Sequence, residues 1–276
     1  MPGEDIAYLY DGSFDGLLCC VHESYYAHEL PVLIFSPETY VYTLYPTKSI
    51  ETDPEKAGRV WRSVGAKISP MAQELALHGY YSCLEGKELV ILKFLRLGYR
   101  VGAAACSMFG NETVHALQGG VLHLKNELQR MLQFLRFEER GGSLAAIVEP
   151  KNFLLPLMQP HFCSRYPEEH FLIYDATHGA ALFYQPYEWK IAPVEHFELA
   201  PADERELRYQ QLWQGFYDAI SIESRYNPRC RMNHMPKRFW NRMVEFYPSA
   251  LANREARASV GAAHGSLPQG DGQGGR

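Results

Sequence analysis

The sequence predicts an α+β protein, with a helical N-terminal and middle part and an antiparallel sheet built from two hairpins and packed helices. Two helix-start signals, in which a capping residue precedes proline, occur in the first 110 residues. After the long middle helix the hydrophobic period changes to two, and glycine-containing turns separate the alternating runs. We expect a single domain over residues 1–249, with a division near residue 110 as an alternative.

The chain begins with a predicted strand at residues 6–10, followed by the turn sequence DGSFDG. Asp11 or Ser13 can cap the helix predicted over residues 14–26. Runs rich in β-branched and aromatic residues predict two further strands, at residues 32–35 and 40–44.

Two helix starts follow, each with a capping side chain directly before a proline. The pairs are Asp53-Pro54 and Ser69-Pro70. The predicted helices cover residues 54–67, 70–83 and 86–99. Asn111 then caps a long helix toward residue 137, whose apolar stripe comprises Leu124, Leu128, Met131 and Leu135.

The second half predicts two hairpins joined by a helix. The first turns at Gly141-Gly142, the helix spans residues 152–165, and the second turns at residues 177–179. A helix beginning near Asp203 has apolar residues at helical spacing, so we expect it to pack against a large surface: Tyr209, Leu212, Trp213, Phe216 and Ile220. Residues 250–276 are rich in glycine and predict a disordered tail.

Composition narrows the class of protein. The 276 residues carry a net charge of −5 and contain no apolar run of membrane-spanning length. The N-terminus has no signal-like segment, so we expect a cytoplasmic protein without a membrane partner. Six scattered cysteines form no C-x-x-C pair, and His115 and His123 lack a third ligand at a diagnostic spacing. We therefore predict no metal site and no cofactor.

A cationic run interrupts this acidic chain. Between residues 224 and 244 there is no acid but six Arg and Lys residues: Arg225, Arg229, Arg231, Lys237, Arg238 and Arg242. Such a run predicts a docking site for an anion. Pro236 is predicted to start a helix, which places Lys237 and Arg238 in a first turn that already carries partial positive charge. Phosphate commonly binds at such a terminus.

Other interpretations of this run remain open. Phe239 and Trp240 recur with later apolar residues at helical spacing, which is typical of core positions, and the cations could form a solvated face. Tyr226 could stack on an unpaired base or pack within its loop. Three cations of the long helix could extend the basic surface: Lys125, Arg130 and Arg136.

Four sequence blocks occur together in a fixed order. They are YLYDGSFDGLLCCVHESY, LKNELQRMLQFLRFEE, VEPKNFLLPLMQPHFCSRYPEEHFLIYDATHG and NPRCRMNHMPKRFW. Across residues 5–247 the chain thereby resembles a bacterial family described as DNA metabolism or repair proteins of undefined activity. MPKRFW and the spacing from FLRFEE to YD are its most specific features.

The resemblance implies a role in DNA repair or modification and DNA as a partner. Family members are typically encoded beside a radical-SAM protein, which makes that protein an expected partner. Some members are fused to a uracil-DNA glycosylase-like domain. We expect no base-excision activity here, because little sequence follows residue 247. The resemblance supplies no catalytic residues.

Whether the chain is an enzyme stays open. A hydrolase or nucleotide-processing enzyme would draw on His161, Asp175 and His178, with Asp175 orienting His178 as a base. The competing interpretation is ordinary turn chemistry, since Asp and His-Gly are common in loops. A third hypothesis is an accessory subunit that binds only protein.

Overall fold

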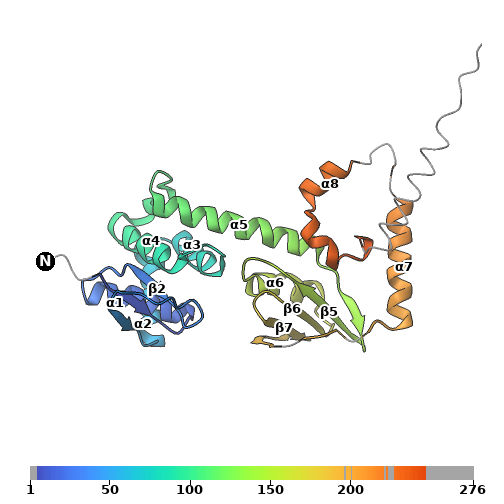
Figure 1. Ribbon diagram of the computed structural model, residues 1–276, viewed down its shortest axis with the longest axis horizontal. Coiled ribbons are helices and arrows are strands. Elements are labelled where there is room, and N and C mark those ends of the chain that lie inside the picture. The colour runs from blue at the N-terminus through green and yellow to red at the C-terminus, as the bar shows by residue number, and fades with distance from the viewer. Residues whose placement is uncertain (1–4, 196, 200, 221, 223–226, 247–276) are drawn as a thin grey trace, which may run out of the picture. The chain divides into compact units, whose positions relative to one another are not determined.

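The computed structural model describes residues 5–195, 197–199, 201–220, 222 and 227–246. By contacts, the chain divides into two compact units (Figure 1). The first comprises Met1–Gln129 with Pro150–Leu154, and the second Arg130–Glu149 with Leu155–Arg276. This division falls within a long helix rather than near residue 110. The tail predicted over residues 250–276 lies outside the described residues.

Helices and strands occur in both units, which confirms the α+β class. The first unit is mainly helical around a small sheet (Figure 1). Its elements are β1 (Ala7–Leu9), α1 (Phe14–Tyr26), β2 (Leu33–Phe35), β3 (Thr47–Ser49), α2 (Pro54–Lys67), α3 (Pro70–Tyr81), α4 (Lys87–Val101), η1 (Gly102–Ser107) and most of α5 (Glu112–Phe134).

The predicted helix starts are confirmed by their capping hydrogen bonds. Ser13, Asp53 and Ser69 each accept from backbone N–H groups in the first turn of the helix that follows. Asn111 Oδ1 accepts from the N–H groups of Thr113 and Val114, so it caps α5. None of the described helices is long and apolar enough to cross a membrane.

The small sheet has the order β2-β1-β3, and both strand pairs are parallel. Residues 40–44, predicted as a strand, are not one. The third strand is β3, a few residues later. The side chains of Val41, Tyr42 and Leu44 are 70%, 82% and 92% exposed, so they gain none of the burial that favours such residues in strands.

The second unit is built around a five-stranded sheet of order β4-β5-β6-β7-β8. Gly141 and Gly142 have positive φ, as the tight turn of the first hairpin requires. Both predicted hairpins are present. The elements are β4 (Glu138–Arg140), β5 (Ser143–Val148), α6 (Leu155–Arg165), β6 (Phe171–Asp175), β7 (Ala180–Gln185), β8 (Glu188–Pro193), α7 (Glu204–Ala219), α8 (Pro228–His234), η3 (Lys237–Arg242) and η4 (Val244–Phe246).

The prediction of a wholly antiparallel sheet was wrong in one strand pair. β5 and β6 run parallel, from Leu144 beside Phe171 to Val148 beside Asp175. The two hairpins are joined by α6, and a connection that contains a helix is long enough to return the chain to the same end of the sheet. The sheet is therefore mixed.

The apolar face of α7 is only partly covered by the described residues. Trp213 donates to Glu245 at 3.1 Å, and Tyr217 packs edge-on against Phe246 with ring centroids 5.8 Å apart. Leu212 and Ile220 remain 61% and 59% exposed. Among the described residues, this helix therefore packs against η4 along one side, and the large packing surface expected for it is only partly present.

Candidate nucleic-acid interface

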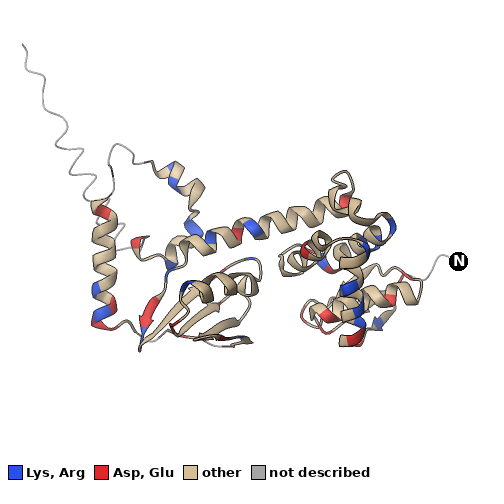
Figure 2. Ribbon diagram, turned by 180° about the vertical axis from the view of Figure 1, so that it is seen from behind, with Lys and Arg blue, Asp and Glu red and all other residues tan. Residues whose placement is uncertain are grey.

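The basic segment, defined as residues 227–246, contains α8, η3 and η4. Its Lys and Arg positions recur along these elements (Figure 2). Five of the six predicted anion-binding residues lie in it: Arg229, Arg231, Lys237, Arg238 and Arg242. Arg225, like Tyr226, lies outside the described residues.

The helix predicted to begin at Pro236 differs from the one observed. Pro236 has ψ 143° and lies before η3, a 3₁₀ helix of six residues. Only six residues lie between Pro236 and Met243, whose backbone is extended, and short helical segments of this kind commonly form i→i+3 hydrogen bonds. Two tight turns supply little dipole, so the side chains, rather than a helix N-terminus, must account for any anion binding.

Two cations of the basic segment lie over Trp240. The Arg231 guanidinium is 5.0 Å from the Trp240 ring centroid and 5.3 Å from that of Phe246. Lys237 Nζ is 5.9 Å from the Trp240 centroid. The two aromatic rings stack with centroids 4.7 Å apart. Arg231 is half-buried in this arrangement and helps pack the segment, whereas Lys237 is exposed.

Two other cations line a separate small cavity of the second unit, beside the end of α5 and β5. The Arg238 guanidinium lies 4.6 Å from the ring centroid of Phe239, which is buried. Arg242 Nε donates to Glu149 Oε1 at 3.1 Å. Both partners of this ion pair are about half exposed, so its net stabilisation is small. The cations therefore form two groups rather than converging on one cleft.

Glu245 is the one acid within the basic segment, and it faces inward. It is 1% exposed, accepts from Arg136 at 2.8 Å, and accepts from Trp213 Nε1 at 3.1 Å. Its charge is therefore balanced inside the unit, and the exposed charges of the segment are all positive. Arg136 and Lys125 do not extend this surface, because Arg136 binds Glu245 and Lys125 binds Glu74.

The candidate catalytic residues do not form one site. Asp175 is fully buried, and its Oδ2 lies 2.6 Å from His178 Nδ1. The other oxygen of Asp175 accepts from the N–H groups of Thr177 and His178, so the carboxylate also closes the hairpin turn. His161 lies on α6 and packs edge-on against Phe162. No described contact joins His161 to the Asp175–His178 pair.

Residues 85–245 match a family model described as a domain of unknown function, DUF4130. This match covers more than half of the 276 residues. The chain belongs to the DUF4130 family. The DUF4130 region includes the five-stranded sheet and the basic segment through Glu245, whereas the strands of the small sheet precede it. Neither the curated proteins nor the solved structures contain a significant match.

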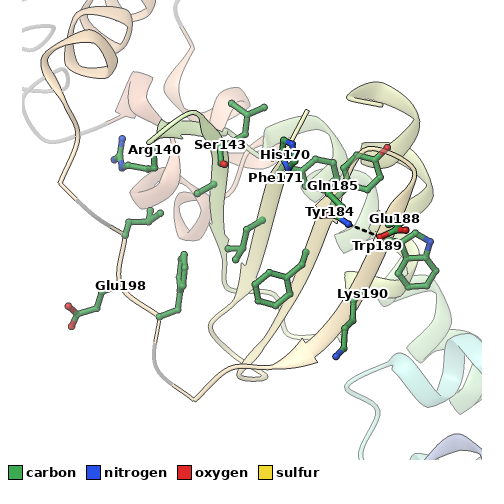
Figure 3. Close-up of a pocket in the computed structure, with 16 residues that line it drawn as sticks. Arg140, Ser143, His170, Phe171, Tyr184, Gln185, Glu188, Trp189, Lys190 and Glu198 are labelled. Atoms are coloured by element: carbon green, nitrogen blue, oxygen red, sulfur yellow. Dashed lines mark hydrogen bonds between the residues drawn. The ribbon is translucent and has the colours of Figure 1, made fainter. Parts of the chain in front are cut away.

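The DUF4130 region also carries a pocket of about 560 Å³ that the sequence did not reveal (Figure 3). It lies on the five-stranded sheet, and strands distant in sequence contribute polar side chains to it, including Arg140, His170 and Lys190. Arg140 already pairs with Glu138, and the lining also contains two acids, Glu188 and Glu198. The pocket is therefore a poor candidate for binding phosphate. Among the described residues, no group of three or more His, Cys, Asp or Glu side chains is placed to hold a metal ion.

Proposed function

We propose that this protein binds nucleic acid through the phosphate-facing cations of its basic segment, and that it acts in DNA repair or modification. The observation that carries the proposal is the inward orientation of Glu245, which leaves the exposed charge of residues 227–246 positive. Arg229 and Lys237 are exposed and have no carboxylate partner among the described residues. A nucleic-acid backbone offers several phosphates, so it can contact more than one group of cations at once.

The link to DNA, and to a radical-SAM protein as partner, rests on the family resemblance of the sequence. Such a partner would supply redox chemistry, and this chain would hold the nucleic acid. The protein's net charge of −5 opposes a broad, non-specific coat on DNA. A short footprint on a single strand or a DNA end fits the limited basic surface better.

The direct test is fluorescence anisotropy with a labelled single-stranded oligonucleotide and the full chain, across a salt series. In the variant Lys237→Gln/Arg238→Gln, affinity should fall, and the slope of log affinity against log salt should shrink by about 1.4, because each lost single-strand phosphate contact contributes about 0.7. The affinity loss should be similar for oligonucleotides of different sequence.

The matched control is Arg59→Gln/Arg62→Gln, which removes two exposed cations from α2 in the first unit. It changes the net charge equally but should leave the salt slope unaltered. If both variants lost the same affinity, the effect would come from net charge alone, which would contradict the proposal. Absence of measurable binding by the wild-type chain, alone and with the co-purified radical-SAM protein, would also contradict it.

A second candidate is a hydrolase or nucleotide-processing enzyme, which the short Asp175–His178 contact favours. In that case His178→Gln should abolish turnover while oligonucleotide affinity stays unchanged, and His161→Ala tests the remaining candidate in the same way. If the protein acts through the basic segment alone, neither substitution should change the affinity for the oligonucleotide, and the wild-type chain should show no turnover.

A further inference from the structure

Cys83 lies in the loop between α3 and α4 of the first unit, and its thiol is exposed. Its Sγ is 3.7 Å from Nδ1 of His123 on α5. The two residues are 40 positions apart in sequence, and the fold of one unit brings them together. A thiol beside an imidazole is the basic arrangement of an activated cysteine nucleophile.

Asn152 positions both partners of this pair. It is fully buried, its Oδ1 accepts from the Cys83 N–H at 2.9 Å, and its Nδ2 lies 3.1 Å from His123 Nδ1. An amide nitrogen can only donate, so Nδ1 of neutral His123 accepts and the ring proton is on Nε2. The basic nitrogen of the imidazole therefore lies on the side of the thiol.

Glu127 fixes Asn152 in turn. Its Oε2 accepts from Asn152 Nδ2 at 2.6 Å, from the Asn152 N–H at 2.9 Å and from the Lys151 N–H at 3.0 Å. Glu127 is 1% exposed, so these bonds operate away from water. Cys83 is thus not an isolated surface cysteine, because a buried chain of hydrogen bonds sets the loop and the imidazole relative to each other.

A lysine side chain lies beside the Cys83 loop. Lys87 Nζ donates to the carbonyl oxygens of Tyr80 and Ser82, beside the Cys83 loop. Burial lowers the pKa of Lys87, and electrostatic interactions, with Glu88 first and Cys83 second, oppose that shift. A nearby cation and an imidazole are the neighbours that stabilise thiolates in reactive cysteines.

We propose that Cys83 is a reactive thiol that undergoes exchange with small-molecule disulfides, with His123 as the base. Cys83 Sγ attacks one sulfur of R–S–S–R, the S–S bond breaks, and R–S⁻ leaves. The thiol proton passes to His123 Nδ1, which gives up its bond from Asn152, and then reaches the leaving thiolate. The products are a mixed disulfide at Cys83 and one R–SH, so the incoming disulfide is the oxidant. The proposal does not rest on nucleic-acid binding.

The experiment follows the reaction of 5,5′-dithiobis(2-nitrobenzoate) with the full chain at pH 7. Cys230, the other exposed thiol of the described residues, lies between two arginines of the basic segment, which favour its reaction with an anionic disulfide, so it is removed rather than used as the reference. The variant Cys163→Ser/Cys230→Ser leaves Cys83 as the one thiol that is not buried, and adding Cys83→Ser gives the background rate. We expect Cys83 to react at least about tenfold faster in this variant than in the same variant carrying His123→Gln.

A second variant separates activation from exposure. His123→Gln retains an acceptor for Asn152 but cannot take a proton, so the loop should keep its structure. The background rate of the buried thiols should not change. At a pH well above the ordinary thiol pKa of about 8.5, the difference between the variants with and without His123→Gln should narrow. An unchanged Cys83 rate in His123→Gln at pH 7 would overturn the proposal.

Discussion

Two carboxylates, one in each unit, are buried to the same extent but held in different ways. Glu127 and Glu245 are both 1% exposed. Glu127 accepts from three N–H groups of residues 151–152, whereas Glu245 accepts from the guanidinium of Arg136 and the indole of Trp213. The two carboxylates are therefore equally buried but have different kinds of hydrogen-bond donor.

The difference between these anchors has consequences for charge. Amide donors stabilise a carboxylate without cancelling its charge, and they bind residues 151–152 to α5. A guanidinium balances the carboxylate charge, so Glu245 does not oppose the positive charge of the exposed Arg229 and Lys237 in the basic segment. A buried acid thus stiffens the Cys83 site in one unit and, in the other, leaves the candidate nucleic-acid interface positive.

The largest effect is expected for Glu127→Leu. Its three described N–H donors would lose their acceptor, and two of them belong to the buried Asn152, so the free energy of unfolding of the first unit should fall by roughly 3–5 kcal/mol. Hydrogen exchange of the first unit's amides measures this loss. The control Asn126→Leu changes an exposed neighbour on α5 and should stay within about 0.5 kcal/mol of wild type.

Local signals in the sequence were sufficient for much of this fold. Caps such as Asp53 and Ser69 act within one helical turn, and Gly141-Gly142 specifies its own hairpin. The parallel pairing of β5 and β6 could not be predicted in this way. A helix separates these strands in the sequence, so their pairing depends on tertiary packing, which local sequence patterns do not determine.

The same distinction applies to the candidate sites. The basic segment is contiguous, so its charge is visible in the sequence, but the inward turn of Glu245 is not. The Cys83 site has no local signal, because its thiol, imidazole and amide are separated by 40 and 29 positions. The 3₁₀ geometry of η3 also depends on tertiary packing, since Phe239 and Met243 are both buried.

Glu245→Leu should have a smaller effect than Glu127→Leu. The Arg136 side chain is 28% exposed, so it can turn toward water when it loses its partner. We expect a loss of about 1–3 kcal/mol from the second unit, together with faster exchange of amides in η4. If Glu245→Leu lost as much stability as Glu127→Leu, the two buried carboxylates would contribute equally, which would contradict the difference described above.

Glu149→Gln tests whether the exposed pair with Arg242 restrains the basic segment. Both side chains are about half exposed, so breaking the pair should change stability by about 0.2–1 kcal/mol. If Arg242 contacts phosphate, releasing it should raise oligonucleotide affinity by up to about fivefold, the same energy expressed as a binding constant. Anisotropy titrations measure the change, and a weakened affinity would contradict this role for Arg242.

The smallest effect is expected for Glu29→Gln, which should alter how the stability of the first unit depends on pH. Although burial opposes it, hydrogen bonds from Lys48 and Tyr8 hold the pKa of Glu29 below its ordinary value. A depressed folded pKa stabilises the first unit above the unfolded pKa, about 4.3 for Glu, and this contribution is lost as the pH falls through the folded value. Glu29→Gln should therefore reduce the acid sensitivity of the first unit by less than about 1 kcal/mol, measured by hydrogen exchange at stepped pH. An unchanged pH profile would contradict this assignment.

Photo-crosslinking of the full chain to a single-stranded oligonucleotide, followed by peptide mapping, tests the proposed interface most directly. We expect salt-sensitive cross-links on peptides from residues 227–246, which decrease in Lys237→Gln/Arg238→Gln and persist in Arg59→Gln/Arg62→Gln. Cross-links confined to the first unit or to the sheet pocket, or cross-links indifferent to salt, would contradict it.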